Sequence, residues 1–215
     1  IIAVERLNRG DYEEADAHAG ETLLIKDKKC RAAAARAHAV RAGVLAHAGD
    51  LDAAVNEYLL AIKNASYAVD YAAFAEAMSN LEQISKDYKK TARGLDSWGN
   101  LQHGLDKNEE ADNYYRQAIK KDPDYLPAYI HAAVNAISTD NFEQALVYYK
   151  QAAAIDPSYE RAQNGIGYML FELTAREQRS AATYFQALDH LNLAISSAPE
   201  YYRPYNTRGL INREL

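Results

Sequence analysis

"ADNYYRQAIKKDPDY" (residues 111–125) and "ALVYYKQAAAIDPSY" (residues 145–159) are two versions of one line. In both, an alanine precedes a tyrosine pair, a basic residue, Gln-Ala and finally Asp-Pro, and every match is offset by 34 residues. Residues three and four apart, such as Ala111, Tyr115 and Ala118, form one apolar face of a helix. Asp-Pro ends that helix, because the residue before proline is disfavoured in the helical conformation and proline has no N–H to donate. The doubled line therefore predicts two equivalent helices in equivalent surroundings.

The composition of the whole chain also favours helices. The 215 residues are 48% hydrophobic and include only ten glycines and five prolines. Alanine, the best helix former, is visibly the commonest residue, and the length suffices for a substantial core. We therefore expect an all-α protein.

Charge and motif content exclude several classes of function. A net charge of −6 and a pI near 5.5 disfavour a nucleic-acid or anionic-membrane surface. No apolar run reaches the roughly 20 residues that span a bilayer, and the single cysteine, Cys30, cannot form an internal disulfide. The sequence has no phosphate-binding P-loop and neither of the catalytic motifs H-E-x-x-H and G-x-S-x-G. No two of the six histidines lie four residues apart, the spacing of metal ligands on one helix face. We predict no enzyme, no cofactor and no metal site.

A longer window around the doubled line carries a family pattern. The stretch from residue 95 to residue 123 resembles the tetratricopeptide repeat, a helix-turn-helix unit of 34 residues written W-x2-L-G-x2-Y, then A-x3-F, an alanine and a proline. Those places hold Leu95, Trp98, Gly99, Gln102, Ala111, Tyr115, Ala118 and Pro123. In the next copy they hold Tyr129, Ala132, Ala133, Ala136, Ala145, Tyr149, Ala152 and Pro157.

The resemblance extends, more loosely, over the rest of the chain. The alanine that anchors the second helix of each copy is matched by Ala15, Ala54, Ile84, Ala111, Ala145 and Ala187. "GDYEEA" (10–15), "GDLDAA" (49–54) and "NLEQI" (80–84) are expected to be turns followed by second helices. We expect one solenoid over residues 1–215, with repeats at 1–30, 35–68, 69–91, 92–125, 126–159 and 160–201, and a terminal helix at 202–215. The family implies a right-handed α-α superhelix, and we expect native residues upstream of Ile1.

The sixth copy has an insertion. It has eight more residues between its two helical anchors than the fifth copy, and their composition favours helix. We expect both helices to be about a turn longer. Tyr184 and Phe185 would then lie on the extension, either packed onto the preceding repeat or forming a contact with a partner or a second copy.

In this family the first helices form a concave wall along which partner proteins or peptides lie. The resemblance therefore implies a non-catalytic scaffold or adaptor that binds a protein or peptide. The alternatives are a homo-oligomeric structural protein and a regulatory repeat region of a larger multidomain protein. The expected groove residues are Asn100, His103, Ile130, His131, Val134, Ile137, Arg161, Asn164, Tyr168, Phe171, Arg203 and Asn206. Either this wall is a binding surface, or neighbouring repeats or a neighbouring subunit bury its apolar residues.

Some relatives bind a C-terminal carboxylate with a lysine, two asparagines, a lysine and an arginine. The corresponding places here hold Asp96, Asn100, His131, Arg161 and Gly165. A carboxylate at Asp96 would repel the ligand's own charge, so we expect a hydrophobic or mixed peptide instead. The sequence leaves the compartment open, with the cytoplasm slightly favoured over an exported location.

Overall fold

The computed structural model describes residues 2–23, 31–68, 71–88, 90–177 and 181–215. Over these residues the regular structure is entirely helical, which confirms the all-α fold predicted from the repeats. The chain divides into two compact units, Ile1–Ser97 and Trp98–Leu215, with the boundary inside helix α6 (Ala92–Gly104). Cys30 lies outside the described residues.

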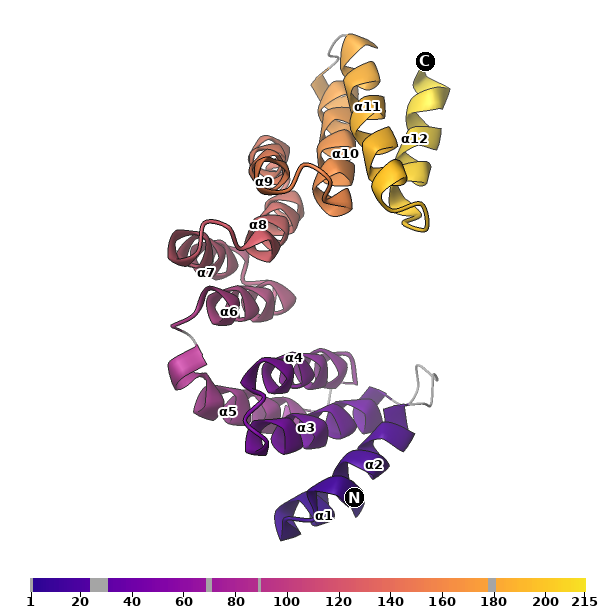
Figure 1. Ribbon diagram of the computed structural model, residues 1–215. Helices are drawn as coiled ribbons and strands as arrows, with labels where there is room; N and C mark the ends of the chain where they lie inside the picture. Colours follow the sequence, from indigo (N-terminus) through magenta and orange to yellow (C-terminus); the bar gives the residue numbers. More distant parts are fainter. Residues whose placement is uncertain (1, 24–30, 69–70, 89, 178–180) are drawn as a thin grey trace. The chain divides into compact units, whose positions relative to one another are not determined.

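The first unit contains two helix pairs and a single helix before the start of α6. These helices are α1 (Ile2–Arg9), α2 (Tyr12–Leu23), α3 (Arg31–His47), α4 (Leu51–Ala68) and α5 (Tyr71–Tyr88). Each packs on the next one along the chain, and α3 also contacts both α1 and α5 (Figure 1). The apolar faces of successive hairpins are thereby buried against one another, as a repeat stack requires.

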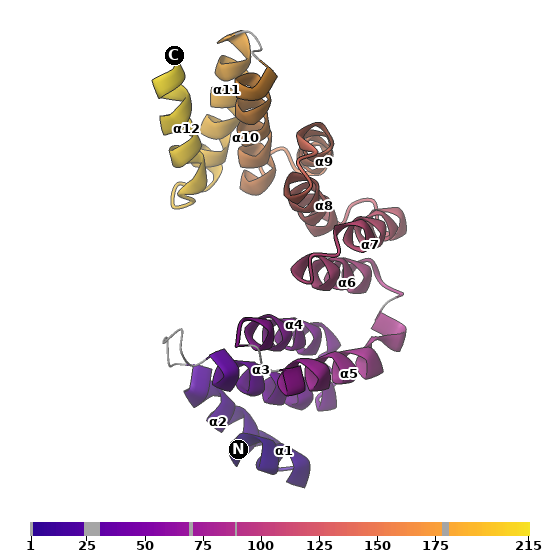
Figure 2. The ribbon, with the colours of Figure 1, turned by 180° about the vertical axis from the view of Figure 1, so that it is seen from behind.

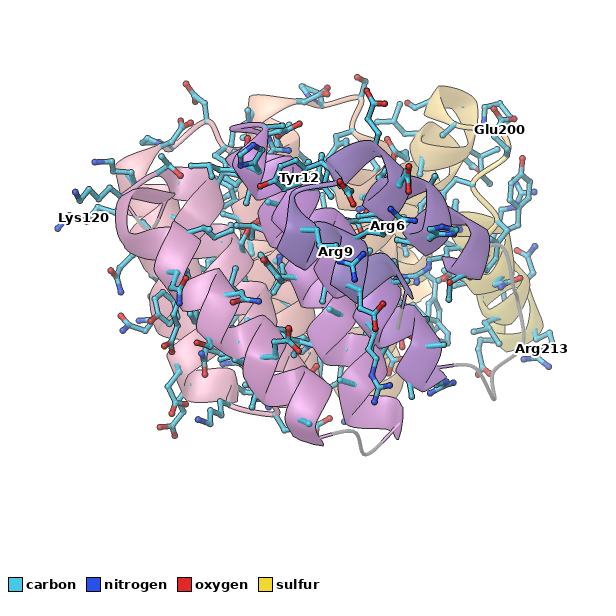
Figure 3. The ribbon with its side chains drawn as sticks, turned by 90° about the horizontal axis from the view of Figure 1, so that it is seen from below. Arg6, Arg9, Tyr12, Lys120, Glu200 and Arg213 are labelled. Atoms are coloured by element: carbon cyan, nitrogen blue, oxygen red, sulfur yellow. The ribbon has the colours of Figure 1, made fainter. Side chains whose placement is uncertain are left out.

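Polar contacts support the helix contacts of this unit. Arg6 on α1 lies 3.3 Å from a carboxylate oxygen of Asp11 in the following turn, and Tyr12 stacks on His47 with ring centroids 3.9 Å apart (Figure 3). Arg41 Nε donates to Asp16 Oδ1 over 2.9 Å and so joins α3 to α2. These side chains reinforce a core that consists mostly of alanine.

The second unit continues from Trp98 through the rest of α6. It contains α7 (Asn108–Lys121), α8 (Leu126–Ser138), α9 (Phe142–Ile155), α10 (Glu160–Glu177), α11 (Ala181–Ser197) and α12 (Arg203–Glu214). Contacts run from α7 through α12 in chain order, and α10 also packs against α12 (Figure 2). The lengths of α10 and α11, 18 and 17 residues against 13 and 14 for α8 and α9, agree with the expected extension of the sixth copy.

Four of the turns between paired helices share one backbone conformation. Gly10, Gly49, Asp106 and Asp140 all have positive φ, from 56° to 85°. In each case the N–H of the following residue donates to the carbonyl five positions earlier, over 2.9–3.0 Å. This bond satisfies a carbonyl at the end of the first helix and reverses the chain. Asn141 then caps α9 by accepting a hydrogen bond from Gln144 N–H over 3.2 Å.

Residues 69–91 depart from the expected hairpin. The turn predicted near Asn80 lies inside α5, which runs without a break from Tyr71 to Tyr88. The prediction of a hairpin there was wrong. The physical reason is that Ser79 stands at the position of Asp140, and serine adopts the left-handed conformation that reverses the chain at Gly49 and Asp140 less readily than glycine or aspartate.

Tyrosines of the doubled line fill the spaces between helices in the second unit. Tyr115 is fully buried against Gly99, where an added Cβ would lie 2.5 Å from Tyr115 Cε1. Tyr149 lies in the same way on Gly165 of α10, where an added Cβ would lie 2.5 Å from Tyr149 Cγ. Each tyrosine ring therefore packs on a helix backbone because glycine leaves that face open.

Candidate functional site

A concave pocket of about 330 Å³ opens on the second unit. Its lining comes from α8, α9, α10 and the segment that leads into α12. The lining residues are Ile130, His131, Val134, Tyr149, Arg161, Asn164, Tyr201, Tyr202 and Arg203. This volume is at the lower end of the range for ligand sites in proteins.

The α8 side of the pocket is partly apolar. Val134 is 39% exposed, whereas Ile130 is only 6% exposed and belongs to the hydrophobic core. His131 is held from behind by Asn100, whose Nδ2 lies 3.2 Å from His131 Nδ1, and Asn100 Oδ1 accepts a hydrogen bond from the Tyr115 hydroxyl over 2.9 Å. Val134 is thus the apolar side chain of α8 that a ligand can reach.

The opposite side of the pocket is basic. Arg161 is the second residue of α10 and Arg203 the first residue of α12, and both are exposed. Because each lies in the first turn of its helix, the positive end of the helix dipole adds to the charge of the side chain. A hydrogen bond with the Tyr202 hydroxyl raises the pKa of the Arg203 guanidinium above its ordinary value.

Tyr149 reaches the pocket because Gly165 leaves room for its ring on α10. Burial raises the pKa of the Tyr149 hydroxyl to about 12, against an opposing effect of nearby Arg203. The hydroxyl therefore stays protonated and uncharged across the physiological pH range.

Asn164 is a largely buried polar residue of the pocket. Its side chain belongs to α10, and the residue is 9% exposed. Its Oδ1 is buried and accepts no hydrogen bond from the residues that the structure describes. Buried amide oxygens are almost always paired, so this one is a candidate for bonding to a ligand.

The structure brings six of the twelve expected groove residues together in this pocket: Ile130, His131, Val134, Arg161, Asn164 and Arg203. Three other lining residues, Tyr149, Tyr201 and Tyr202, are not among those expected. Tyr149 repeats Tyr115 of the preceding copy, and that repetition indicates packing. Tyr201 and Tyr202 follow Pro199, in the connection before α12, where the family pattern places no site residue.

The remaining expected residues lie elsewhere. His103 Nδ1 lies 3.0 Å from Asn135 Oδ1, in a network between α6 and α8. Ile137, Tyr168 and Phe171 are half-buried against the hydrophobic core, and Asn206 is exposed on α12.

The family can now be assigned from the matched residues. Residues 98–125 and 126–159 match the family model of the tetratricopeptide repeat. Residues 98–159 are therefore two tetratricopeptide repeats. The two matched repeats contain α8, the α9 tyrosine of the pocket and the doubled line.

Solved structures of other tetratricopeptide-repeat proteins share the fold. The first such domain of Spaghetti (RPAP3), bound to the HSP90 peptide SRMEEVD, is 20% identical, has a TM-score of 0.52 and aligns over 59% of this chain and 94% of that one. YrrB, described as a tetratricopeptide-repeat protein with an unusual peptide-binding site, is 18% identical to this chain and has a TM-score of 0.51. The alignment covers 84% of this chain and 92% of YrrB. The tetratricopeptide-repeat domain of Sgt2 from Aspergillus fumigatus is 19% identical and has a TM-score of 0.50. The alignment covers 57% of this chain and 78% of the Sgt2 domain. No curated protein sequence matches the chain.

The first lysine and the arginine of the carboxylate-binding arrangement correspond here to Asp96 and Gly165. Asp96 is 3% exposed, so it belongs to the interior of the first unit. Gly165 is covered by the Tyr149 ring. The known arrangement thus lacks its first lysine and its arginine, for packing reasons at both places.

The two aromatic residues of the extended hairpin have different surroundings. Tyr184 packs against Phe171 of α10, with ring centroids 6.1 Å apart. Phe185 is 58% exposed. A partner or second copy at Phe185 stays a prediction, which light scattering over a range of protein concentrations would test.

Among the described residues, no helix is long and apolar enough to cross a bilayer, and no three histidine, cysteine or acidic side chains gather in a way that could hold a metal ion.

Proposed function

We propose that this tetratricopeptide-repeat protein is a non-catalytic adaptor that binds a short extended peptide segment of another protein in the pocket between α8 and α12. The observation that carries the proposal is the pocket itself, in which an exposed valine and several polar side chains lie on packed helices. Such a mixture suits a peptide, whose apolar side chains and main-chain groups need both kinds of partner.

The rigidity of the lining supports this function. Tyr149 is fixed by its packing on Gly165, and His131 by Asn100 and Tyr115. A ligand that binds such a preformed surface loses its own conformational freedom but does not have to order the protein. The RPAP3 domain with its HSP90 peptide is a precedent for peptide binding on this fold.

The test starts with a random peptide library, from which ligands that bind the purified protein are selected. Half of the library displays peptides with free C-termini, and the other half displays them as internal segments. For a selected peptide, Val134→Gln is expected to weaken binding roughly tenfold, because the apolar contact in the pocket is lost. The free energy of unfolding should change by less than about 0.5 kcal/mol, since Val134 is 39% exposed. Fluorescence anisotropy and urea unfolding measure the two quantities.

Val147→Gln is the matched control. Val147 on α9 is 46% exposed and does not line the pocket. Equal losses of affinity in the two variants, or no selectable peptide at all, would contradict peptide binding at this site.

A further inference from the structure

The charges around the pocket are one-sided, although the protein as a whole is acidic. The chain carries a net charge of −6, yet among the described residues that line the pocket Arg161 and Arg203 are the arginines, and there is no lysine, aspartate or glutamate. The nearest acid along the chain, Glu160, is half-buried and does not line the pocket, although its charge acts on Tyr201, which does. The basic side is therefore a local feature that the average composition conceals.

The two arginines are brought together by the packing of α10 against α12. Both residues lie in the first turn of their helix, so the positive ends of two helix dipoles add to the charge of the arginines that line the pocket. Arginine is suited to planar carboxylate groups, to which it can donate two parallel hydrogen bonds. The basic side favours an anionic group on the ligand.

Asn164 provides a second, independent observation. It lies on α10 three residues after Arg161, is nine-tenths buried, and has a side-chain oxygen without a donor among the described residues. A side-chain amide offers one acceptor and two donors, which match the N–H and C=O of a peptide main chain. Because rotation about χ2 of asparagine is permissive, the amide can turn toward a ligand in the pocket that it lines.

We propose that the pocket recognises a carboxylate-bearing peptide: the carboxylate pairs with Arg161 and Arg203, the Asn164 amide bonds the adjacent main chain, and an apolar side chain contacts Val134. This inference rests on the proposed peptide-binding function and adds the chemistry and direction of the ligand. The apolar residue lies toward α8 and the carboxylate toward α12.

This arrangement differs from the set of lysine, asparagine and arginine side chains with which some relatives bind a C-terminal carboxylate. Of the five places of that arrangement, His131 and Arg161 line the pocket, and only Arg161 carries a guanidinium; Arg203 comes from the helix after the last hairpin. The expectation of a hydrophobic or mixed peptide followed from Asp96, which is buried in the first unit and does not line the pocket. The carboxylate can come from the ligand's C-terminus or from an aspartate or glutamate side chain.

The first experiment uses the peptides selected from the two halves of the library. We expect the selected peptides to share a carboxylate, either the free C-terminus or an acidic side chain at a fixed position. Amidating the C-terminus, or replacing the acidic residue by its amide, should weaken binding roughly tenfold, and the arm that shows the loss identifies the source of the carboxylate. Arg161→Gln and Arg203→Gln should each weaken binding to a similar extent.

The matched control is Arg213→Gln, which removes the same charge from the last turn of α12 (Figure 3). Arg213 is exposed and does not line the pocket, so its loss should change the affinity less than twofold. Circular dichroism melting of each variant shows whether it is folded. Neutral peptides that depend on Val134 but not on the two arginines would overturn the carboxylate proposal and leave the peptide-binding function standing. Failure to select any peptide that depends on Val134 would overturn both.

Asn164→Leu separates a binding role from a structural one. If Asn164 is kept for the ligand, replacing its unpaired amide by an apolar group of similar size leaves the melting temperature unchanged or higher, while the affinity for the selected carboxylate peptide falls roughly tenfold. A lower melting temperature with unchanged affinity would show that Asn164 supports the fold, and would overturn its part in the proposal.

Discussion

Leu191→Ala is expected to lower the free energy of unfolding of the second unit by about 2–5 kcal/mol. Leu191 on α11 is 0% exposed, and an added Cβ on Gly167 of α10 would lie 2.6 Å from its Cγ. The two helices are therefore so close that the leucine side chain fills the space between them. Alanine would leave a cavity there, because packed helices relax only in part around a missing side chain.

Urea unfolding followed by circular dichroism measures this loss. Leu193→Ala, two residues further along α11, is the control, because Leu193 is 41% exposed and its replacement should change the free energy by less than about 0.5 kcal/mol. The fluorescence of Trp98, the only tryptophan, reports the unfolding of the first helix pair of the second unit, whereas circular dichroism reports the loss of all helices. A Leu191 variant as stable as the Leu193 variant would contradict the contact between α10 and α11.

Gly165→Ala is expected to destabilise the protein by about 1–3 kcal/mol. The added Cβ would overlap the ring of Tyr149, which is 7% exposed, so the ring would have to shift against the side chains packed around it. Alanine is otherwise the better helix former by about 1 kcal/mol, so the overlap has to outweigh that gain. Urea unfolding gives the sign of the change directly.

Two further variants make this result specific. Gly209→Ala on α12 meets no atom within 4 Å, so it should stabilise the protein by up to about 1 kcal/mol. Tyr149→Leu combined with Gly165→Ala should recover part of the loss, because the smaller side chain leaves room for the new methyl group. Additive losses in the double variant would show that the two residues do not compete for the same space.

The sequence predicted the repeat fold best where its spacing is regular. In residues 92–159 the alanines, tyrosines and Asp-Pro pairs recur at a fixed offset, and α6 to α9 occur as predicted. At residues 69–91 the prediction relied on the similarity of "NLEQI" (80–84) to "NFEQA" (141–145). The first stretch matches the start of the second helix of the fifth copy, but the residue before it differs. In the fifth copy that preceding residue is Asp140, with φ of 56°, whereas the corresponding position within α5 is helical. A helix start without a chain reversal is an ordinary stretch of helix.

Only some of the residues that line the pocket could be predicted from the sequence. Counting positions along first helices found Val134, Arg161 and Asn164, because the family's helix geometry fixes which side they face. It missed Tyr201 and Tyr202, because the path of a connection depends on how α12 docks against α10 and not on a repeating pattern. The count also could not show that Ile130 is mostly buried, since burial depends on neighbours from other helices.

The sequence by itself determined that this protein consists mostly of helix pairs, because the period of small residues, aromatic residues and helix-ending prolines is a local property of the chain. Only the tertiary structure decided what the stack can bind. Arg161 and Arg203 lie far apart along the chain and reach one pocket because α10 packs on α12, and the unpaired oxygen of Asn164 becomes evident only when every neighbour is in place. Hydrogen-bond satisfaction and charge clustering depend on distances in space, and a repeat pattern does not encode those distances.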